Sequence, residues 1–146
     1  MKMMMIMMAG LITCFCAYSQ DIPASQVPAA VTKAFKAKFP KTTGLEWEKK
    51  GDLYEAEFDV SLVDHKALYE ASGKLVAFKK DIRKTDLPAA VKRAIETQYK
   101  GFRIDDADRV ERGGAVFYQV ELDGKPDDQK LVFTKDGKVD STQQYW

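Results

Sequence analysis

The chain has 146 residues, of which 45% are hydrophobic and 31% are charged. This length accommodates one domain or two small ones, and the composition is that of a folded globular protein, which excludes a disordered or fibrous chain. The 23 basic and 22 acidic residues nearly balance and are interspersed along the chain. Because proteins that bind phosphate backbones normally carry a basic patch or excess, we expect no nucleic-acid partner.

The first residues have the features of a secretory signal peptide. Lys2 is the only charged residue before an apolar run that ends in Ala17-Tyr18-Ser19. The run is shorter than the roughly 20 residues of a membrane-spanning helix, and small residues occupy the two positions that a signal peptidase reads. We predict a signal peptide at residues 1–19, no membrane span in the mature chain, and a periplasmic or secreted location.

Both cysteines, Cys14 and Cys16, lie within this predicted signal peptide. The mature chain is therefore expected to have no disulfide and no cysteine metal site. Removal of Lys2 also lowers the formal net charge from +1 to 0. In the alternative reading, Leu11-Ile12-Thr13-Cys14 is an imperfect lipobox with an unusually large Thr13, and the protein is a lipoprotein anchored through Cys14.

An internal repeat appears when the chain is compared with itself. The segment VPAAVTKAF at 27–35 returns, with substitutions, 60 residues later as LPAAVKRAI at 87–95. Further along, YEAEF at 54–58 matches YQVEL at 118–122, which is 64 residues later. The second copy therefore holds four extra residues after its helix. We divide the mature chain into repeat 1, residues 20–84, and repeat 2, residues 85–146.

Each repeat is predicted to open with an amphipathic helix, with Pro28 or Pro88 in its first turn and Asp86 as a candidate cap of the second helix. Apolar residues recur at the three- and four-residue spacing of a helix face. These residues are Val27, Val31, Ala34, Phe35 and Phe39 in repeat 1, and Leu87, Val91, Ala94, Ile95 and Tyr99 in repeat 2.

After each helix the apolar period changes from 3.6 to 2, as expected for strands with one buried face. Turn signals separate the strands, among them Gly51-Asp52, Val63-Asp64, Ser72-Gly73 and Asp136-Gly137. The fold class is therefore predicted to be α+β: two tandem repeats, each a helix followed by a four-stranded antiparallel meander, with the helices packed on one face of the sheet. Five aromatic residues follow the buried parity and are assigned to packing: Tyr54, Phe58, Tyr69, Tyr118 and Phe133.

This secreted arrangement resembles the PepSY-like, beta-lactamase-inhibitor-like proteins of bacterial envelopes. The resemblance rests on the opening Val/Leu-Pro-Ala-Ala-Val and closing Gly-Lys-Leu/Val motifs of the two repeats. It implies an extracytoplasmic protein whose sheet has helices on one side and an open face on the other. In inhibitor-type relatives that face docks against another protein. No inhibitory loop motif can be matched to this sequence, so the inhibitory activity is not transferred by residue.

The residues that usually carry catalysis are sparse. His65 is the only histidine, it is interpreted as a strand-edge residue, and no mature cysteine can pair with it. Nucleotide-binding and hydrolase motifs are absent, so we predict no enzyme, no catalytic residue, no metal and no cofactor. The acidic clusters at 105–108 and 123–128 are interpreted as solvated loops, with weak calcium binding left open.

The outward-facing strand residues are the candidate binding site, because they combine an acidic stripe with apolar groups, as protein interfaces do. The alternative is that they are ordinary surface residues, or that the apolar ones pack against the other repeat or a second subunit. Trp47, Tyr145 and Trp146 fall near predicted strand ends, where a ring could anchor a partner. The candidate binding residues are Leu53, Glu55, Glu57, Asp59, Leu68, Phe117, Gln119, Glu121 and Val132.

From these features we expect a non-enzymatic extracytoplasmic binding module, in which the open sheet face contacts an unidentified envelope protein, with an inhibitor or modulator of an envelope enzyme as one form. The alternative function is a small-ligand or ion sensor of the cell envelope, with a pocket between the repeats or at the acidic loops. Neither the oligomeric state nor the continuity of the sheet between the repeats follows from the sequence.

Overall fold

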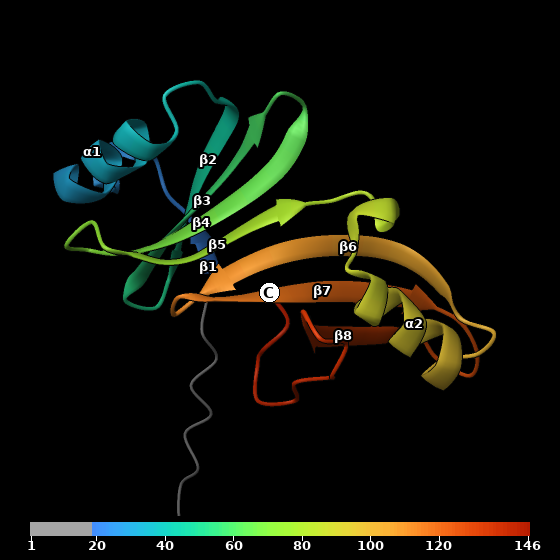
Figure 1. The fold of residues 1–146 in the computed structure, drawn as a ribbon. Coiled ribbons are helices and arrows are strands. Elements are labelled where there is room, and N and C mark those ends of the chain that lie inside the picture. The colour runs from blue at the N-terminus through green and yellow to red at the C-terminus, as the bar shows by residue number, and fades with distance from the viewer. Residues whose placement is uncertain (1–18) are drawn as a thin grey trace, which may run out of the picture.

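The computed structural model describes residues 19–146, in which eight antiparallel strands form one sheet and two helices cover one of its faces (Figure 1). The helices are α1 (Ala29–Lys38) and α2 (Ala89–Gln98). The strands are β1 (Ser19–Asp21), β2 (Thr43–Lys50), β3 (Leu53–Val60), β4 (Val63–Glu70), β5 (Leu75–Asp81), β6 (Arg103–Arg112), β7 (Ala115–Asp123) and β8 (Gln129–Thr134). The predicted signal peptide with Cys14 and Cys16 lies outside the described residues, apart from Ser19.

The strands follow one another across the sheet in chain order, from β1 to β8. Every neighbouring pair is antiparallel. Short connections explain this for the hairpins, whereas a helix lies between β1 and β2 and between β5 and β6. The predicted α+β class, with both helices on one face, is therefore confirmed. The link between the halves is the pairing of β5 with β6, which makes the sheet continuous.

The helices bury the faces that the sequence pattern predicted. Val31 and Phe35 are buried on α1, and Val91 and Ile95 occupy the equivalent positions on α2. The expected cap at Asp86 is wrong: Pro88 stands at the N-cap without a side-chain hydrogen bond, and Asp86 instead pairs with Arg83 at 2.9 Å.

Each helix covers its own apolar cluster, and the two clusters occupy equivalent places in the two halves. Phe58 and Tyr69 lie under α1, while Leu122 and Phe133 lie under α2. All five aromatic residues assigned to packing belong to these clusters. Phe58, Tyr69 and Phe133 are buried members, and Tyr54 and Tyr118 are half-buried residues that pack against them. Trp47, considered as a partner anchor, is instead a buried member of the first cluster.

The two turns that contain Gly73 and Gly137 pack against the first turns of the helices. At Gly73 and Gly137 the backbone φ angles are +88° and +80°, a region that glycine adopts without strain. A Cβ atom at either position would run into a helix carbonyl oxygen, that of Ala30 or Ala90. The Gly-Lys motif in each repeat therefore allows a hairpin to approach a helix closely.

Two features differ from the prediction. The second half has three strands instead of four, since β8 is followed only by an isolated bridge between Phe133 and Val139. The chain then continues as a final segment, Asp140–Trp146, which contains no strand. Within residues 19–146, neither helix approaches the length and apolarity that a membrane span requires.

Candidate binding face

The nine candidate residues all lie on the face of the sheet opposite the two helices, which we call the helix-free face. The register places Glu55 beside Leu68 and Gln119 beside Val132, and none of the nine belongs to either apolar cluster. They form two groups, on β3–β4 and on β7–β8, which β5 and β6 separate.

Sequence analysis missed the residues between these groups. Lys79 on β5 and Asp108 and Arg112 on β6 lie on the same face, as their pairing with Val110, Asp81 and Ala77 shows. Neither strand alternates cleanly between polar and apolar residues, because charged residues such as Lys80 and Arg109 lie on the opposite face. Only the register with the neighbouring strands places these residues. The helix-free face is thus continuous across the junction of the two halves.

The expectation that this face is open is wrong for its centre. Glu55 and Gln119 are each only 1% exposed, and Val132 is 5% exposed. Glu57 remains exposed, and the other five predicted residues are half-buried. The buried residues that belong to neither apolar cluster gather here: Glu55, Ala77, Asp108, Val110, Gln119 and Val132.

The final segment accounts for this burial, because it folds back across the helix-free face (Figure 1). Arg112 donates to the main-chain oxygen of Gln144 at 3.2 Å, and Gln119 donates to the same oxygen at 3.5 Å. Lys79 donates to the main-chain oxygen of Trp146 at 2.9 Å. The segment therefore runs from β8 across the middle of the sheet to the first half.

Trp146 is seated over the carboxylate of Glu55. The indole Nε1 of Trp146 donates to Glu55 Oε2 at 2.5 Å, and the other oxygen, Oε1, accepts from Lys50 at 2.7 Å. Lys66 lies 3.8 Å from Oε1, and the Arg112 guanidinium lies 6.0 Å from the centre of the indole ring. Glu55 is therefore a buried charge with both oxygens engaged, as such a group requires.

The acidic stripe of β3 is largely compensated by cations. Glu57 forms an ion pair with Lys66 at 2.7 Å, next to the Glu55–Lys50 pair. Asp59 differs, because it faces Asp64 across the ladder. A shared hydrogen bond with Asp64 raises the pKa of Asp59 above its usual value, and burial and the like charge act in the same direction.

A second acidic group lies under the final segment. The carboxylates of Asp81, Asp106 and Asp108 approach within 4.8 Å of one another. Residues 105–108 belong to β6, so their interpretation as a loop is wrong. Burial, reinforced by a hydrogen bond with Asp81, raises the pKa of Asp108 to about 7, although Lys79 opposes the shift. Because the Lys79 ammonium already lies 3.3 Å from this carboxylate, we assign no metal here.

His65 lies on the helix side of the sheet, away from the helix-free face. Its ring stacks on Phe58, with the ring centres 5.5 Å apart, and lies 5.6 Å from the ring centre of Phe78. Its Nδ1 is 2.6 Å from the main-chain oxygen of Val63. These contacts give His65 a packing role.

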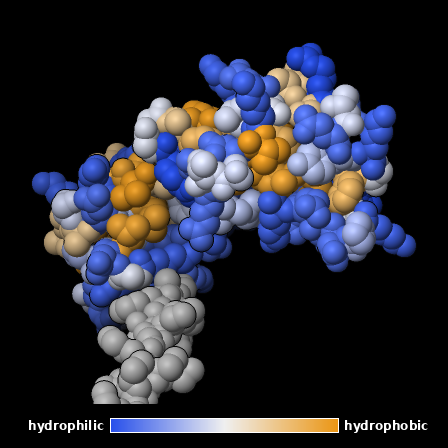
Figure 2. Space-filling view, turned by 90° about the horizontal axis from the view of Figure 1, so that it is seen from below, coloured by the Kyte–Doolittle hydropathy of each residue, from blue (hydrophilic) through white to orange (hydrophobic). Residues whose placement is uncertain are grey.

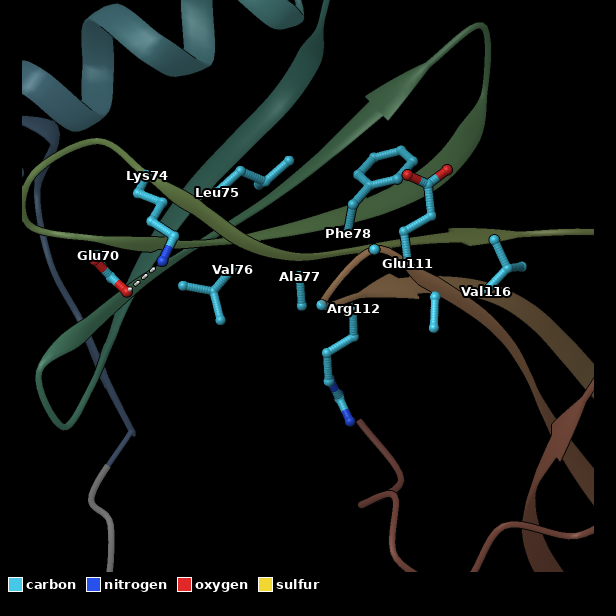
Figure 3. Close-up of a pocket in the computed structure, with 12 residues that line it drawn as sticks. Glu70, Lys74, Leu75, Val76, Ala77, Phe78, Glu111, Arg112 and Val116 are labelled. Atoms are coloured by element: carbon cyan, nitrogen blue, oxygen red, sulfur yellow. Dashed lines mark ion pairs between the residues drawn. The ribbon is translucent and has the colours of Figure 1, made fainter.

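One cavity of about 510 Å³ lies where the two halves meet, at the end of the sheet that carries the β4–β5 and β6–β7 turns. Figure 3 shows Phe78 and Glu111 on one side of the strands and Arg112 pointing to the other side, toward the final segment. The cavity borders the helix-free face but does not include the Trp146 seat.

The sequence comparison identifies the family. A family model described as "Putative beta-lactamase-inhibitor-like, PepSY-like" matches residues 16–77 and 52–140. The two matches together span most of the chain, and the chain belongs to this family. Among curated proteins, none matches the chain.

Solved structures from Bacteroides share the fold. A Bacteroides eggerthii protein titled among "putative periplasmic proteins" has a TM-score of 0.71 and 22% identity, with 77% of this chain and 85% of that chain covered. A DUF2874 family protein from Bacteroides uniformis has a TM-score of 0.70 and 23% identity, with 77% of this chain and 85% of that chain covered. A BLIP-like protein from Bacteroides fragilis has a TM-score of 0.66 and 23% identity, with 77% of this chain and 82% of that chain covered. At these identities the likeness shows the fold alone.

Proposed function

We propose that the protein is a non-enzymatic, extracytoplasmic binding module, periplasmic or secreted, that contacts another envelope protein through the helix-free face. The observation that carries this proposal is the row of charged and apolar side chains that runs across both halves of the sheet. Glu57, Lys66 and Lys79 follow one another across β3, β4 and β5, and the row continues to Phe117 on β7. A polar surface around partly buried apolar groups is the anatomy of a protein interface.

Further support comes from the chemistry of the chain and from its relatives. The only histidine of the chain is used in packing, since its ring stacks on Phe58. Seen from below, the surface of the molecule is mostly hydrophilic, with separate hydrophobic patches (Figure 2). The family description names inhibitor-like proteins, and one structural relative is titled periplasmic. Inhibition of an envelope enzyme is the finer form of the proposal.

The test is an affinity capture from an envelope extract of the native host, followed by a binding measurement with the purified partner. Glu57→Lys should weaken binding at least tenfold, because it reverses an exposed charge at the rim of the face and repels Lys66. Glu55 is unsuitable for charge reversal, because its carboxylate is buried and a lysine in its place would face Lys50 and Lys66.

Glu96→Lys on α2 is the matched control, since it makes the same charge change on an exposed residue of the opposite layer. It should leave binding unchanged. Equal affinity of wild type and Glu57→Lys, with Glu96→Lys weakened, would move the interface to the helix side and overturn the proposal.

A small-ligand function is the second candidate, and the cavity at the junction of the halves favours it. Val76, Ala77 and Val116 provide apolar walls, and Glu111 and Arg112 provide opposite charges. A ligand in this cavity would raise the melting temperature of the protein in a metabolite panel. Arg112→Ala and Glu111→Ala should remove that rise if the cavity is the site.

A further inference from the structure

The helix-free face is already occupied by a peptide, namely the final segment of the chain. Three side chains of the sheet, Lys79, Arg112 and Gln119, donate to main-chain oxygens of this segment. Side chains that bind main-chain oxygens are insensitive to the sequence of the occupant, whereas the Trp146 seat selects an indole. The face therefore combines general recognition of a peptide with contacts to particular side chains, those of Gln143, Tyr145 and Trp146.

The way in which the segment is held differs from the rest of the fold. β1 to β8 are joined by backbone ladders. The segment keeps one backbone hydrogen bond at its start, from Asp140 to the main-chain oxygen of Val132 at 2.8 Å, but the contacts of Gln144 and Trp146 with the sheet run through side chains. No strand is assigned to residues 140–146. Displacing residues 141–146 would therefore leave the ladder hydrogen bonds of the sheet in place.

The segment also leaves part of the face unsatisfied. Oδ1 of Asp108 and Oε1 of Gln119 are buried acceptors without a hydrogen-bond partner, and the two residues lie directly opposite each other on β6 and β7. Buried acceptors without a donor destabilise the structure, because no hydrogen bond replaces the one that they lose to water. An occupant that brings an N–H group to this point would fit the face better than the chain's own segment does.

We infer that the helix-free face is a binding site for an extended peptide segment that carries a tryptophan side chain, and that Asp140–Trp146 occupies this site in competition with the partner. The inference rests on the proposed function and names the chemistry of the partner. The partner segment supplies an indole N–H to Glu55, main-chain oxygens to Lys79 and Arg112, and a donor to Asp108 or Gln119.

The effective concentration of the tethered segment sets how strongly it competes with a free peptide. A segment tethered by a short linker acts at an effective concentration of about millimolar. A free peptide with the same contacts therefore meets a strong internal competitor in the wild-type chain, and a partner must either bind more tightly or use the two unsatisfied acceptors. Weakening the internal segment should expose the site.

The experiment uses the full chain and a synthetic peptide with the sequence Asp-Ser-Thr-Gln-Gln-Tyr-Trp, which is that of residues 140–146. Peptide binding is measured by isothermal titration calorimetry to wild type and to Trp146→Ala. We expect the affinity for Trp146→Ala to be at least tenfold higher than for wild type. The same peptide with alanine in place of its tryptophan should lose binding by at least tenfold.

Two further variants in the Trp146→Ala background localise the site. Arg112→Ala should weaken peptide binding severalfold, because its guanidinium contacts Gln144 and lies over the indole. Arg103→Ala, on the same strand but paired with Asp123, is the matched control and should have no effect. If Trp146→Ala fails to fold by circular dichroism, Trp146→Phe replaces it, since it keeps an aromatic ring and removes the donor to Glu55.

Equal binding of the peptide to wild type and the variant, or binding that ignores the tryptophan of the peptide, would overturn the inference. So would the absence of binding to a folded variant. These results are separate from those of the proposed function. If no peptide binds but Glu57→Lys still abolishes the partner complex, the binding function stands and the peptide site falls. If the peptide binds and Glu57→Lys has no effect on binding of the partner, the peptide site stands and the proposed partner interface falls.

Discussion

At the scale of single residues, the centre of the helix-free face buries polar groups whose hydrogen bonds are only partly satisfied. Asp108 is 1% exposed, and the neighbouring carboxyl of Asp81 and the charge of Asp106 disfavour its ionised form, while Lys79 favours it. Burial is the main cause that raises the pKa of the Tyr145 hydroxyl, and the charge of nearby carboxylates, Asp108 first among them, raises it further. The protonation of Asp108 should therefore affect the stability of the fold.

Asp108 should make the protein less stable as the pH rises. In the folded chain its pKa is about 7, against about 3.9 when unfolded, so the folded state binds the proton more tightly. Its contribution is fully present below pH 4 and is lost as the pH rises to 7. Asp108→Asn removes this dependence, and its free energy of unfolding should gain on wild type by as much as about 4 kcal/mol between pH 4 and pH 7. Urea unfolding at several pH values measures the difference.

Asp105→Asn is the control for this measurement, because Asp105 is an exposed carboxylate of the same strand that does not belong to the cluster. Its stability should follow the pH dependence of wild type. Parallel curves for Asp108→Asn and wild type would show that Asp108 stays ionised in the folded protein at neutral pH.

The β3–β4 turn is a site of backbone strain. Ser61 and Leu62 have φ angles of 52° and 65°, although neither is glycine, and Leu62 is 95% exposed. A two-residue turn with two positive φ angles favours Asn-Gly. Ser61→Asn with Leu62→Gly should therefore raise the free energy of unfolding by roughly 1 kcal/mol, since relief of strain outweighs the added freedom of the unfolded chain. A lower melting temperature of the double variant would contradict this explanation.

At the scale of elements, the contact between hairpin and helix recurs in both halves. Gly73 and Gly137 combine a positive φ angle with a position against a helix carbonyl, whereas Gly51 has a positive φ angle of 60° and open space around its Cβ position. Gly73→Ala and Gly137→Ala should each lower the free energy of unfolding by roughly 3 kcal/mol, because the hairpin must move away from the helix. Gly51→Ala should cost only about 1 kcal/mol. Equal losses at all three positions would show that backbone strain alone decides the effect.

The elements that sequence analysis predicted best are those with a clear period. The helix faces of α1 and α2 and the inward residues of β3 and β7 were found because burial imposes spacing of 3.6 or 2 on the chain. The β3–β4 turn was placed at Val63-Asp64, two residues too late, because Ser61-Leu62 lacks the residues that mark such turns. The missing fourth strand of the second half reflects the departure of the chain from the sheet after Val139.

The candidate face was predicted in part for the same reason. Parity placed Glu55, Gln119 and Val132 on one face, but parity cannot indicate what covers that face. The contact between Trp146 and Glu55 joins residues 91 positions apart. Such a contact depends on the whole path of the chain, and no local pattern in the last residues indicates it.

At the scale of the whole molecule, two apolar clusters share one sheet. The clusters have no members in common, so the halves are joined by the β5–β6 ladder and by the final segment, which spans from β8 to Glu55. A continuous ladder transmits the loss of one half to the other, because unfolding β6 exposes the hydrogen-bonding edge of β5. We therefore expect the two halves to unfold together.

The two tryptophans allow this expectation to be tested. Trp47 lies in the first cluster, and in a Trp146→Phe background it is the only tryptophan of the chain. Phe133→Ala then removes a fully buried ring from the second cluster, at a cost of roughly 3–5 kcal/mol. If the molecule is one cooperative unit, the urea midpoint seen by Trp47 fluorescence should fall with the midpoint seen by circular dichroism. Lys135→Ala, an exposed change two residues after Phe133, should leave both midpoints in place. An unchanged Trp47 midpoint, with an earlier partial loss of the circular dichroism signal, would mean that the first half folds alone and that the junction is a contact between two independent units.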